Sequence, residues 1–271
     1  MKKIVITGAL GYIGSELCKL YSGFSWKYDI VAIDNRFISE RVNELKRRKI
    51  KFIQADILDI DSIKPYIEKA EVIHHLAGIT DVAYVKKESD KAKDDLIEKV
   101  AIEGTANVLK SMNADATIVF PSTHVVFEGL KEQKENLDEN EKTNTFLTYS
   151  TSKVENENQI IKSGKKYAIF RLGSVYGFST DTMRINIMPN LFSKIASQNG
   201  KIKLFGGGVQ LKSLVPLIDV TRCFKFVEEK EDFKNGIYNL SKENCTVKDV
   251  ADICKKINPK LEVISTDDEV P

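Results

Sequence analysis

The sequence predicts an α/β protein built on a doubly wound parallel sheet. Short runs rich in Ile and Val recur along the 271-residue chain, and longer charged stretches of helical character separate them. Strands of a parallel sheet are buried on both faces, so they read as continuous apolar runs, and helices connect them. A chain of this length holds one large domain, or a large domain that carries a small one.

The first elements follow in order from this alternation. Strands are expected at residues 3–6, 29–33, 51–54, 71–74, 117–120 and 167–172. Helices are expected between them, at residues 12–21, 40–48, 60–69, 90–112 and 148–163. The polar stretch 128–142 predicts a surface loop.

The pattern changes after residue 177, where the elements become shorter. A helix is expected at residues 187–197, and strands at residues 201–204 and 211–217. We therefore predict a main domain over residues 1–177 and a smaller, discontinuous region over residues 178–271, some segments of which return to the main sheet.

The charge pattern argues against a nucleic-acid partner. Lys and Arg number 41 and Asp and Glu number 39, and the two signs alternate along the chain, so no basic face for a polyanion forms. Four scattered cysteines without a C-x-x-C motif suggest neither a zinc site nor a redox motif. We expect reduced thiols, no metal site and a cytoplasmic location.

The sequence also argues against a membrane partner. No apolar run approaches the roughly 20 residues that a bilayer span needs. The basic start and the apolar run behind it resemble a secretory signal, but Gly8, Gly11 and Gly14 interrupt that run. We expect neither a signal peptide nor a membrane span.

A glycine-rich turn joins the first strand to the first helix. Gly8, Gly11 and Gly14 follow the strand in a Gly-x-x-Gly-x-x-Gly pattern. Glycines there permit a tight turn and let a pyrophosphate approach the backbone at the helix N-terminus. Glycine turns at such junctions also occur for packing reasons alone. The strand in front of the motif favours a Rossmann-like, dinucleotide-binding fold.

Asp34 closes the second strand, twenty residues after Gly14. A carboxylate at that place accepts hydrogen bonds from the adenosine ribose and repels a 2′-phosphate, which favours NAD over NADP. Arg36 lies two residues further on and argues the other way. The alternative role for Asp34 is a loop carboxylate that caps a turn.

The next two strands also end in candidate ligand contacts. Asp56 and Ile57 follow the third strand, and Ala77 and Gly78 follow the fourth. Both ends belong to the carboxyl edge of the sheet, where open α/β folds bind ligands. For His74 and His75, no second ligand set is near in the sequence, so packing and hydrogen bonding are favoured over metal binding.

Tyr149 and Lys153 carry the sharpest chemical signal. A spacing of four residues places the phenol and the ammonium on one helix face, where the cation favours the phenolate. The tyrosine then exchanges a proton while a hydride moves to or from a nicotinamide. Ser122 and Thr123, at the end of the fifth strand, offer a hydroxyl beside it. A solvated helix face is the alternative explanation of the pair.

These motifs together resemble the extended short-chain dehydrogenases/reductases of the NAD-dependent epimerase/dehydratase family, which mostly act on nucleotide-linked sugars. The resemblance runs from Lys3 to about Leu240. It implies NAD as cofactor, a nucleotide-sugar substrate bound mainly by residues 178–271, and Thr123, Tyr149 and Lys153 as the catalytic set. The implied cofactor contacts are Gly8, Gly11, Tyr12, Ile13, Gly14, Asp34, Asn35, Arg36, Asp56, Ile57, Leu76, Ala77, Gly78, Tyr149 and Lys153. The implied substrate contacts are Thr123, His124, Asn190 and Lys212.

Departures from the family pattern narrow the reaction. His124 and Val125 stand where the dehydratases carry an Asp-Glu pair, so elimination of water is disfavoured. No cysteine matches the acid of the 3,5-epimerases. Lys212 replaces an arginine that grips phosphate with a planar fork. Other departures are Ala101 for an asparagine, Pro216 for a histidine, and an early end at Pro271 that implies a reduced substrate lid.

Three hypotheses follow from the resemblance. The first is a nucleotide-sugar 4-epimerase that uses NAD, and the second is a nucleotide-4-keto-sugar reductase. The third is a catalytically silent protein that uses the dinucleotide for regulation. A homodimer through helices 90–112 and 148–163 is also expected, since the first helix offers Leu96, Val100, Val108 and Leu109, although the second has a polar middle at residues 155–158.

Overall fold

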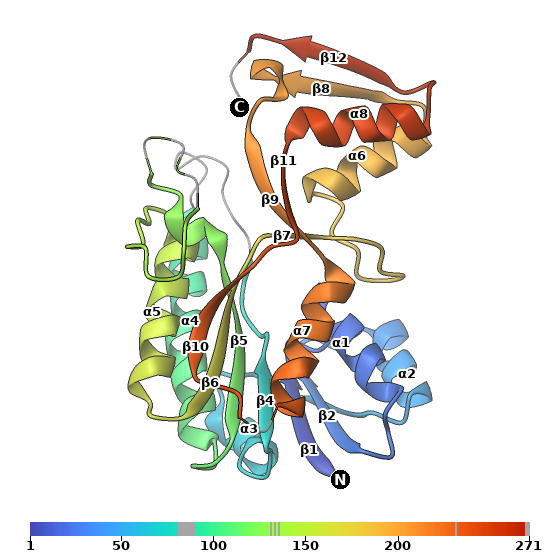
Figure 1. The fold of residues 1–271 in the computed structure, drawn as a ribbon. Helices are drawn as coiled ribbons and strands as arrows, with labels where there is room; N and C mark the ends of the chain where they lie inside the picture. Colours follow the sequence, from blue (N-terminus) through green and yellow to red (C-terminus); the bar gives the residue numbers. More distant parts are fainter. Residues whose placement is uncertain (81–89, 131, 133, 135, 231, 269–271) are drawn as a thin grey trace. The chain divides into compact units, whose positions relative to one another are not determined.

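The computed structural model describes residues 1–80, 90–130, 132, 134, 136–230 and 232–268. In these residues seven strands form one central sheet in the order β10-β6-β5-β4-β1-β2-β3 (Figure 1). β1 pairs in parallel with β2 and β4, and the β2–β3 and β4–β5 pairs are parallel too. The strands are β1 (Lys2–Thr7), β2 (Tyr28–Asp34), β3 (Lys51–Gln54), β4 (Val72–His75), β5 (Thr117–Thr123), β6 (Lys166–Leu172) and β10 (Gly236–Leu240).

Helices cover both faces of this sheet (Figure 1). One face carries α3 (Ile60–Ile67), α4 (Lys91–Ser111) and α5 (Thr148–Lys162). The other carries α1 (Tyr12–Ser22), α2 (Ser39–Arg47) and the later part of α7 (Leu217–Glu229). The predicted Rossmann-like, doubly wound α/β fold is confirmed.

The adjacent histidines of β4 show how the strand is sandwiched. His74 stacks on Phe224 of α7, with ring centroids 6.2 Å apart, and its Nε2 lies 2.8 Å from the hydroxyl of Tyr21 in α1. His75 points to the opposite face, where its Nε2 lies 3.0 Å from Oγ1 of Thr105 in α4. Successive strand residues alternate between faces, so two polar side chains are buried here on two different layers.

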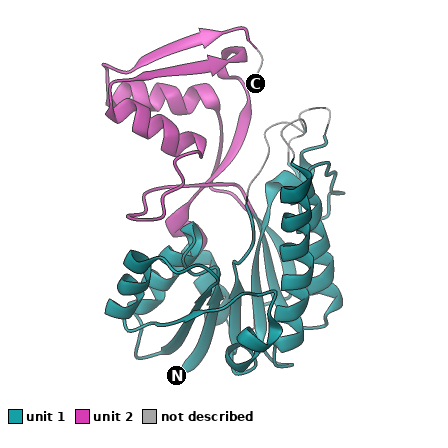
Figure 2. Cartoon of the chain, turned by 180° about the vertical axis from the view of Figure 1, so that it is seen from behind, with its two compact units in different colours: residues 1–171, 221–239 teal, residues 172–220, 240–271 magenta. Residues whose placement is uncertain are grey.

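The chain divides into two compact units (Figure 2). Unit 1 comprises residues 1–171 and 221–239, and unit 2 comprises residues 172–220 and 240–271. The chain therefore leaves unit 1 after residue 171 and returns to it through most of α7 and β10.

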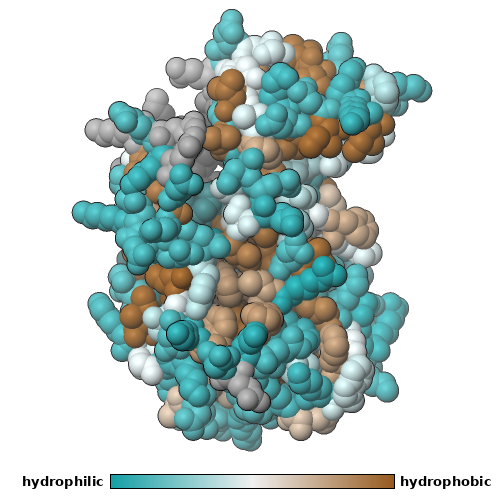
Figure 3. Space-filling model, viewed as in Figure 1, coloured by the Kyte–Doolittle hydropathy of each residue, from teal (hydrophilic) through white to brown (hydrophobic). Residues whose placement is uncertain are grey.

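Unit 2 has its own small core, made of Phe192, Ile202, Leu214, Ala251 and Leu261 among others. Figure 3 shows apolar atoms over its helices, and Ile253 and Ile257 of the second helix are more than half exposed. Its elements are β7 (Ser174–Tyr176), α6 (Met188–Ser197), β8 (Lys201–Phe205), β9 (Leu211–Pro216), β11 (Glu243–Thr246), α8 (Val247–Ile257) and β12 (Glu262–Thr266).

The apolar residues of α4 serve the interior of unit 1. Val108 is fully buried, and Val100 and Leu109 pack against the same core, which leaves Leu96 as the half-exposed one of the four. Of the four residues offered for a dimer interface, Val100, Val108 and Leu109 are thus used by the core of unit 1. The homodimer itself stays a prediction.

The two residues in the middle of the polar stretch of α5 point inward. Asn156 and Glu157 are 2% and 3% exposed, whereas Glu155 is exposed. Helical periodicity assigns charged residues to solvent unless a partner is known, and here the partners come from other elements of the chain.

Candidate functional site

The glycine turn between β1 and α1 is tightly packed against the end of β4. Gly8 has a positive φ of 66°, and a Cβ there would lie 2.7 Å from the backbone nitrogen of Ala77. A Cβ on Gly14 would lie 2.4 Å from the carbonyl oxygen of Gly8. Close packing therefore excludes a side chain at Gly8 and at Gly14, whether or not a ligand binds.

The N-terminus of α1 also suits an anion. Its N-cap is Gly11, no side chain caps it, and no acidic residue lies in its first turn. Free N–H groups at the start of a helix attract negative charge, and no carboxylate in that turn repels it. The turn therefore fits the pyrophosphate of a dinucleotide.

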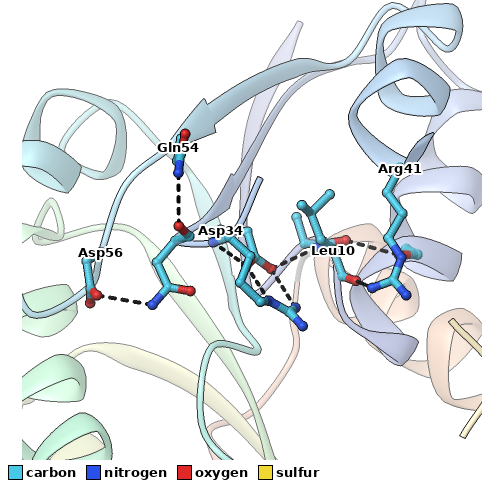
Figure 4. A network of polar contacts seen from close by, with 9 residues as sticks. Leu10, Asp34, Arg41, Gln54 and Asp56 are labelled. Carbon is cyan, nitrogen blue, oxygen red and sulfur yellow. Dashed lines mark hydrogen bonds and ion pairs between the residues drawn. The ribbon is translucent and has the colours of Figure 1, made fainter. Parts of the chain in front are cut away.

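Asp34 lies behind this turn and is 4% exposed (Figure 4). Its Oδ2 accepts from the backbone N–H of Leu10 at 3.0 Å and from Nη2 of Arg36 at 3.1 Å. Its Oδ1 accepts from the backbone nitrogen and Nε of Arg36 at 3.1 and 3.0 Å. Four donors occupy about as many acceptor sites as a carboxylate has. A ribose hydroxyl would therefore displace Arg36.

Arg41 ties α2 to the same turn, and the sequence offered no signal for it. Its Nη1 donates to the carbonyl oxygen of Leu10 at 2.7 Å (Figure 4). The contact comes from a surface helix 31 residues away and fixes the loop that Asp34 also holds.

The ends of β2 and β3 form an open polar pocket of about 410 Å³. Asn35 donates through Nδ2 to Oδ2 of Asp56 at 3.1 Å, and Gln54 donates to the carbonyl oxygen of Asn35 at 3.2 Å. The structure thus brings Asn35 and Asp56 together at the neighbouring ends of β2 and β3. The lining residues are Asn35, Gln54, Ala55, Asp56, Asp59 and Ser62.

His75 belongs to a buried chain of hydrogen bonds. Its Nδ1 lies 2.9 Å from Oγ1 of Thr7, and Thr105, its partner at Nε2, accepts from Nδ2 of Asn156 at 3.1 Å. Ala77 donates its N–H to Thr7 at 3.2 Å. The chain links the glycine turn to α5. Burial lowers the pKa of His75 to about 3, so the imidazole is neutral.

The part of the chain that the structure describes holds no group of three or more His, Cys, Asp or Glu side chains that fits a metal ion. Among the same residues, no helix is both long and apolar enough to cross a membrane.

Tyr149 and Lys153 lie one turn apart near the start of α5, as their spacing predicts. The Lys153 ammonium is 5.9 Å from the ring centroid of Tyr149 and 4.4 Å from that of Phe120. Its Nζ donates to the carbonyl oxygen of Pro121 at 2.9 Å. Burial lowers the pKa of Lys153 to about 8, and the nearby charge of Glu157 acts against that shift.

Thr123 ends β5 and is 7% exposed. Its Oγ1 accepts from the backbone N–H of Val125 at 3.2 Å and so caps the short 3-10 helix that begins at His124. That contact uses an oxygen lone pair and not the hydroxyl hydrogen, which remains available as a donor.

Glu128 caps α5 from outside the helix. Its Oε1 accepts from the backbone N–H groups of Phe146 and Leu147 at 3.1 and 2.9 Å, and from the hydroxyl of Ser150. The helix has no cap of its own at Leu147. Sequence reasoning missed Glu128, because the loop of residues 128–142 gave no indication that its first residue returns to the helix.

Asn190 and Lys212 belong to unit 2, and the other predicted site residues belong to unit 1. The amide of Asn190 is 3% exposed, accepts from the N–H of Gly177 at 3.0 Å and donates to the carbonyl oxygen of Arg184 at 2.9 Å. Lys212 lies on β9, opposite Cys245 of β11, and is exposed.

Two known proteins of similar sequence carry the names of nucleotide-sugar enzymes. The putative UDP-glucose 4-epimerase of Methanocaldococcus jannaschii is 28% identical over 261 residues, which is 93% of this chain and 81% of that protein. The dTDP-D-glucose 4,6-dehydratase of Dictyostelium discoideum is 25% identical over 89% of this chain, which spans only 58% of that protein's length.

Solved structures share the fold. The UDP-glucuronic acid 4-epimerase of Bacillus cereus, in complex with UDP-glucuronic acid and NAD, superposes with a TM-score of 0.82 at 24% identity, covering 99% of this chain and 87% of that one. The UDP-glucose 4-epimerase of Thermus thermophilus, in complex with NAD, gives 0.77 at 20% identity, covering 96% and 85%.

The family model described as the NAD dependent epimerase/dehydratase family matches residues 4–241. This span contains the glycine turn, Asp34, Thr123 and the Tyr149–Lys153 pair. The chain therefore belongs to the NAD dependent epimerase/dehydratase family and is an enzyme whose cofactor is NAD.

Proposed function

We propose that the chain is a nucleotide-sugar 4-epimerase with Tyr149 as acid and base, Lys153 as the cation that tunes it, and Thr123 as the donor that orients the sugar. One observation carries the proposal. The ammonium of Lys153 is held on the carbonyl oxygen of Pro121, at the strand end that bears Thr123, and lies 5.9 Å from the ring of Tyr149. The three residues and the glycine turn belong to the same compact unit, which supports a shared site.

Tyr149 performs the proton transfers of this reaction. Bound NAD supplies a hydride acceptor and then a hydride donor for C4 of the sugar. Tyr149 removes the proton of the C4 hydroxyl and returns it once the sugar presents its other face. The charge of Lys153 favours the phenolate, and the Thr123 hydroxyl holds the sugar oxygen in a reactive orientation.

The residues of unit 1 also fit the cofactor. The uncapped start of α1 accepts the pyrophosphate, and Gly8, Gly11, Tyr12, Ile13 and Gly14 form its turn. Asp34, released from Arg36, accepts the adenosine ribose, and Lys153 donates to the nicotinamide ribose. Asn35, Arg36, Asp56, Ile57, Leu76, Ala77 and Gly78 complete the proposed contact set.

On the substrate side, we assign His124, Asn190 and Lys212 to the nucleotide-sugar. Lys212 is exposed and offers a point charge to phosphate. The amide of Asn190 already serves two backbone groups of unit 2, so its contact would use remaining hydrogen-bonding capacity. The named 4-epimerases above act on UDP-sugars, so UDP-sugars are the first substrates to test.

A nucleotide-4-keto-sugar reductase is the second candidate, and Arg36 favours it. Because Arg36 occupies the acceptors of Asp34, the ribose gains less than it would from a free carboxylate, which suits a cofactor that leaves after each turnover. The dTDP-4-dehydrorhamnose reductase of Aggregatibacter actinomycetemcomitans is 24% identical over 90% of this chain. Purified protein that retains NAD(H) supports the epimerase, and rapid exchange supports the reductase.

A thermal-shift screen with UDP-, GDP-, dTDP- and CDP-sugars in the presence of NAD tests the substrate class. A ligand that binds only the folded protein raises its apparent stability. A sugar that stabilises the protein is then assayed for its C4 epimer.

We also propose a cytoplasmic location, which the four free cysteines support.

A further inference from the structure

Glu157 is a buried carboxylate on the face of α5 that carries Tyr149 and Lys153, one turn beyond the lysine. It forms a fork with Arg171 of β6, in which Nη2 lies 2.8 Å from Oε2 and Nε lies 3.1 Å from Oε1. Ser122 of β5 donates its hydroxyl to Oε1 at 2.5 Å. All three side chains are at most 5% exposed, so the carboxylate is fixed in place from two strands.

We propose that Glu157 is a positioning residue that acts through Lys153: held by Arg171 and Ser122 one helical turn away, its carboxylate keeps the lysine charged beside Tyr149. The inference rests on the proposed function only for the use that the enzyme makes of Lys153. Glu157 itself does not contact the reacting atoms.

The surroundings of Lys153 explain why a carboxylate is needed there. On β4 it faces the neutral His75, on β5 the ring of Phe120 and the carbonyl oxygen of Pro121, and on α5 Tyr149 and Glu157. Among these described neighbours Glu157 supplies the negative charge. Burial favours the uncharged amine, and a fixed anion one turn away favours the ammonium.

Arg171 fixes the carboxylate of Glu157 in place. The forked guanidinium and the serine hydroxyl make charge-assisted hydrogen bonds to the carboxylate and fix its orientation. Arg171 also donates through Nη1 to the carbonyl oxygen of Glu139 at 3.2 Å, so the fork is itself anchored. A purely structural ion pair would bind α5 to β6 without affecting the titration of Lys153.

The test is the titration of Lys153, read by NMR from protein labelled with ¹³C at the lysine ε-carbon. The Lys153 resonance is identified by its absence from Lys153→Met. Glu157→Gln keeps the side-chain shape and removes the charge. Because it leaves Arg171 buried without a partner, Glu157→Gln/Arg171→Met is measured beside it, since replacing a whole buried ion pair is often well tolerated.

We expect the midpoint of Lys153 to move to lower pH by at least about half a unit in Glu157→Gln, and in the same direction by less in the double variant, which also loses the Arg171 cation. Ser122→Ala, which removes one hydrogen bond and keeps the charge, is the matched control and should leave the midpoint close to that of the wild type. An unmoved midpoint in Glu157→Gln, with or without a lower Tm, overturns the inference and makes the pair structural.

Activity then separates this inference from the proposed function. If the chain is a 4-epimerase, the alkaline limb of its pH–rate profile moves with the NMR midpoint in Glu157→Gln/Arg171→Met. If the midpoint moves but no nucleotide-sugar is turned over by the wild type, the inference about Glu157 stands and the proposed function fails.

Discussion

Arg36 covers the carboxylate of Asp34 with three N–H groups, namely its backbone nitrogen, Nε and Nη2, at 3.1, 3.0 and 3.1 Å. A ribose that binds Asp34 takes over acceptors that Arg36 holds. The arginine side chain is half exposed and is held on the carboxylate that we propose binds the ribose, so we expect Arg36 to weaken NAD binding and to assist NADP binding.

Arg36→Gln is therefore expected to bind NAD about two- to fivefold more tightly, the scale of a partly exposed ion pair, and to bind NADP more weakly. Calorimetric titration of both cofactors measures this. Arg41→Gln is the control, because Arg41 contacts Leu10 and not Asp34. Weaker NAD binding in Arg36→Gln would mean that Arg36, and not Asp34, recognises the ribose.

The pKa of Lys153, lowered by burial to about 8, predicts an alkaline limit to activity. The rate should fall as the pH rises above about 8, because the neutral amine no longer favours the phenolate. Lys153→Arg should be slower but should lack this limb, since a guanidinium stays charged. A rate that stays level to about pH 10 in the wild type would show that the ammonium is not required.

The lowered pKa of Lys153 makes the stability of the folded protein depend on pH. The unfolded chain binds a proton at Lys153 up to its ordinary pKa of 10.5, and the folded chain only up to about 8. Stability therefore gains from this residue as the pH rises from 8 to 10.5, and below 8 its burial cost is complete. Denaturation across that range should show a steeper rise in the wild type than in Lys153→Met.

Glu128 should stabilise α5 as an external cap. Glu128→Gln is expected to lower the free energy of unfolding by about 1 kcal/mol, because a neutral amide oxygen is a weaker acceptor at the positive end of the helix. Chemical denaturation measures the difference. Glu155→Gln, an exposed change on the same helix, should be close to neutral. Equal effects of the two changes would argue against the cap.

His74 and His75 should make the protein sensitive to acid. Burial lowers the pKa of both from 6.5 to about 3, so the unfolded chain binds protons that the folded chain does not. The free energy of unfolding is therefore not reduced by these histidines above pH 6.5. It falls as the pH drops from 6.5 toward 3, because the unfolded chain then takes up protons that the folded chain does not.

His75→Gln should reduce this acid slope by one proton. Its amide takes the place of Nε2 and keeps the contact with Thr105, while the contact with Thr7 is lost at about 1 kcal/mol. In His75→Asn the amide takes the place of Nδ1, so the contact with Thr7 is kept and the contact with Thr105 is lost. An unchanged acid slope in both variants would contradict a buried neutral His75.

The sheet and its helices were predictable because burial on both faces leaves an unmistakable apolar run in each strand. The run at residues 71–74 predicts β4, which the structure places at Val72–His75, and the helix predicted at 12–21 is α1. The strand β10 gave no such run: in Gly236–Leu240 none of the residues is fully buried, so its place beside β6 depends on tertiary pairing.

The position of Tyr149 and Lys153 on one helix was predictable, because two residue types suited to proton transfer stand four residues apart. Glu157 was not, since its burial depends on Arg171 in another element. Glu157 stands four residues after Lys153, and that spacing on one helix face was the available signal. The contact of Arg36 with Asp34 was equally hidden, because a separation of two residues does not determine where the arginine side chain points.

The decisive measurement is incubation of the protein with NAD and nucleotide-sugars deuterated at C4. We expect at least one of the UDP-, GDP-, dTDP- or CDP-sugars to be converted to its C4 epimer with the deuterium retained, and we expect Tyr149→Phe to bind NAD but to form no product. Failure of every sugar to form its C4 epimer, in protein shown to hold NAD, or unchanged turnover in Tyr149→Phe, would contradict a 4-epimerase that uses Tyr149.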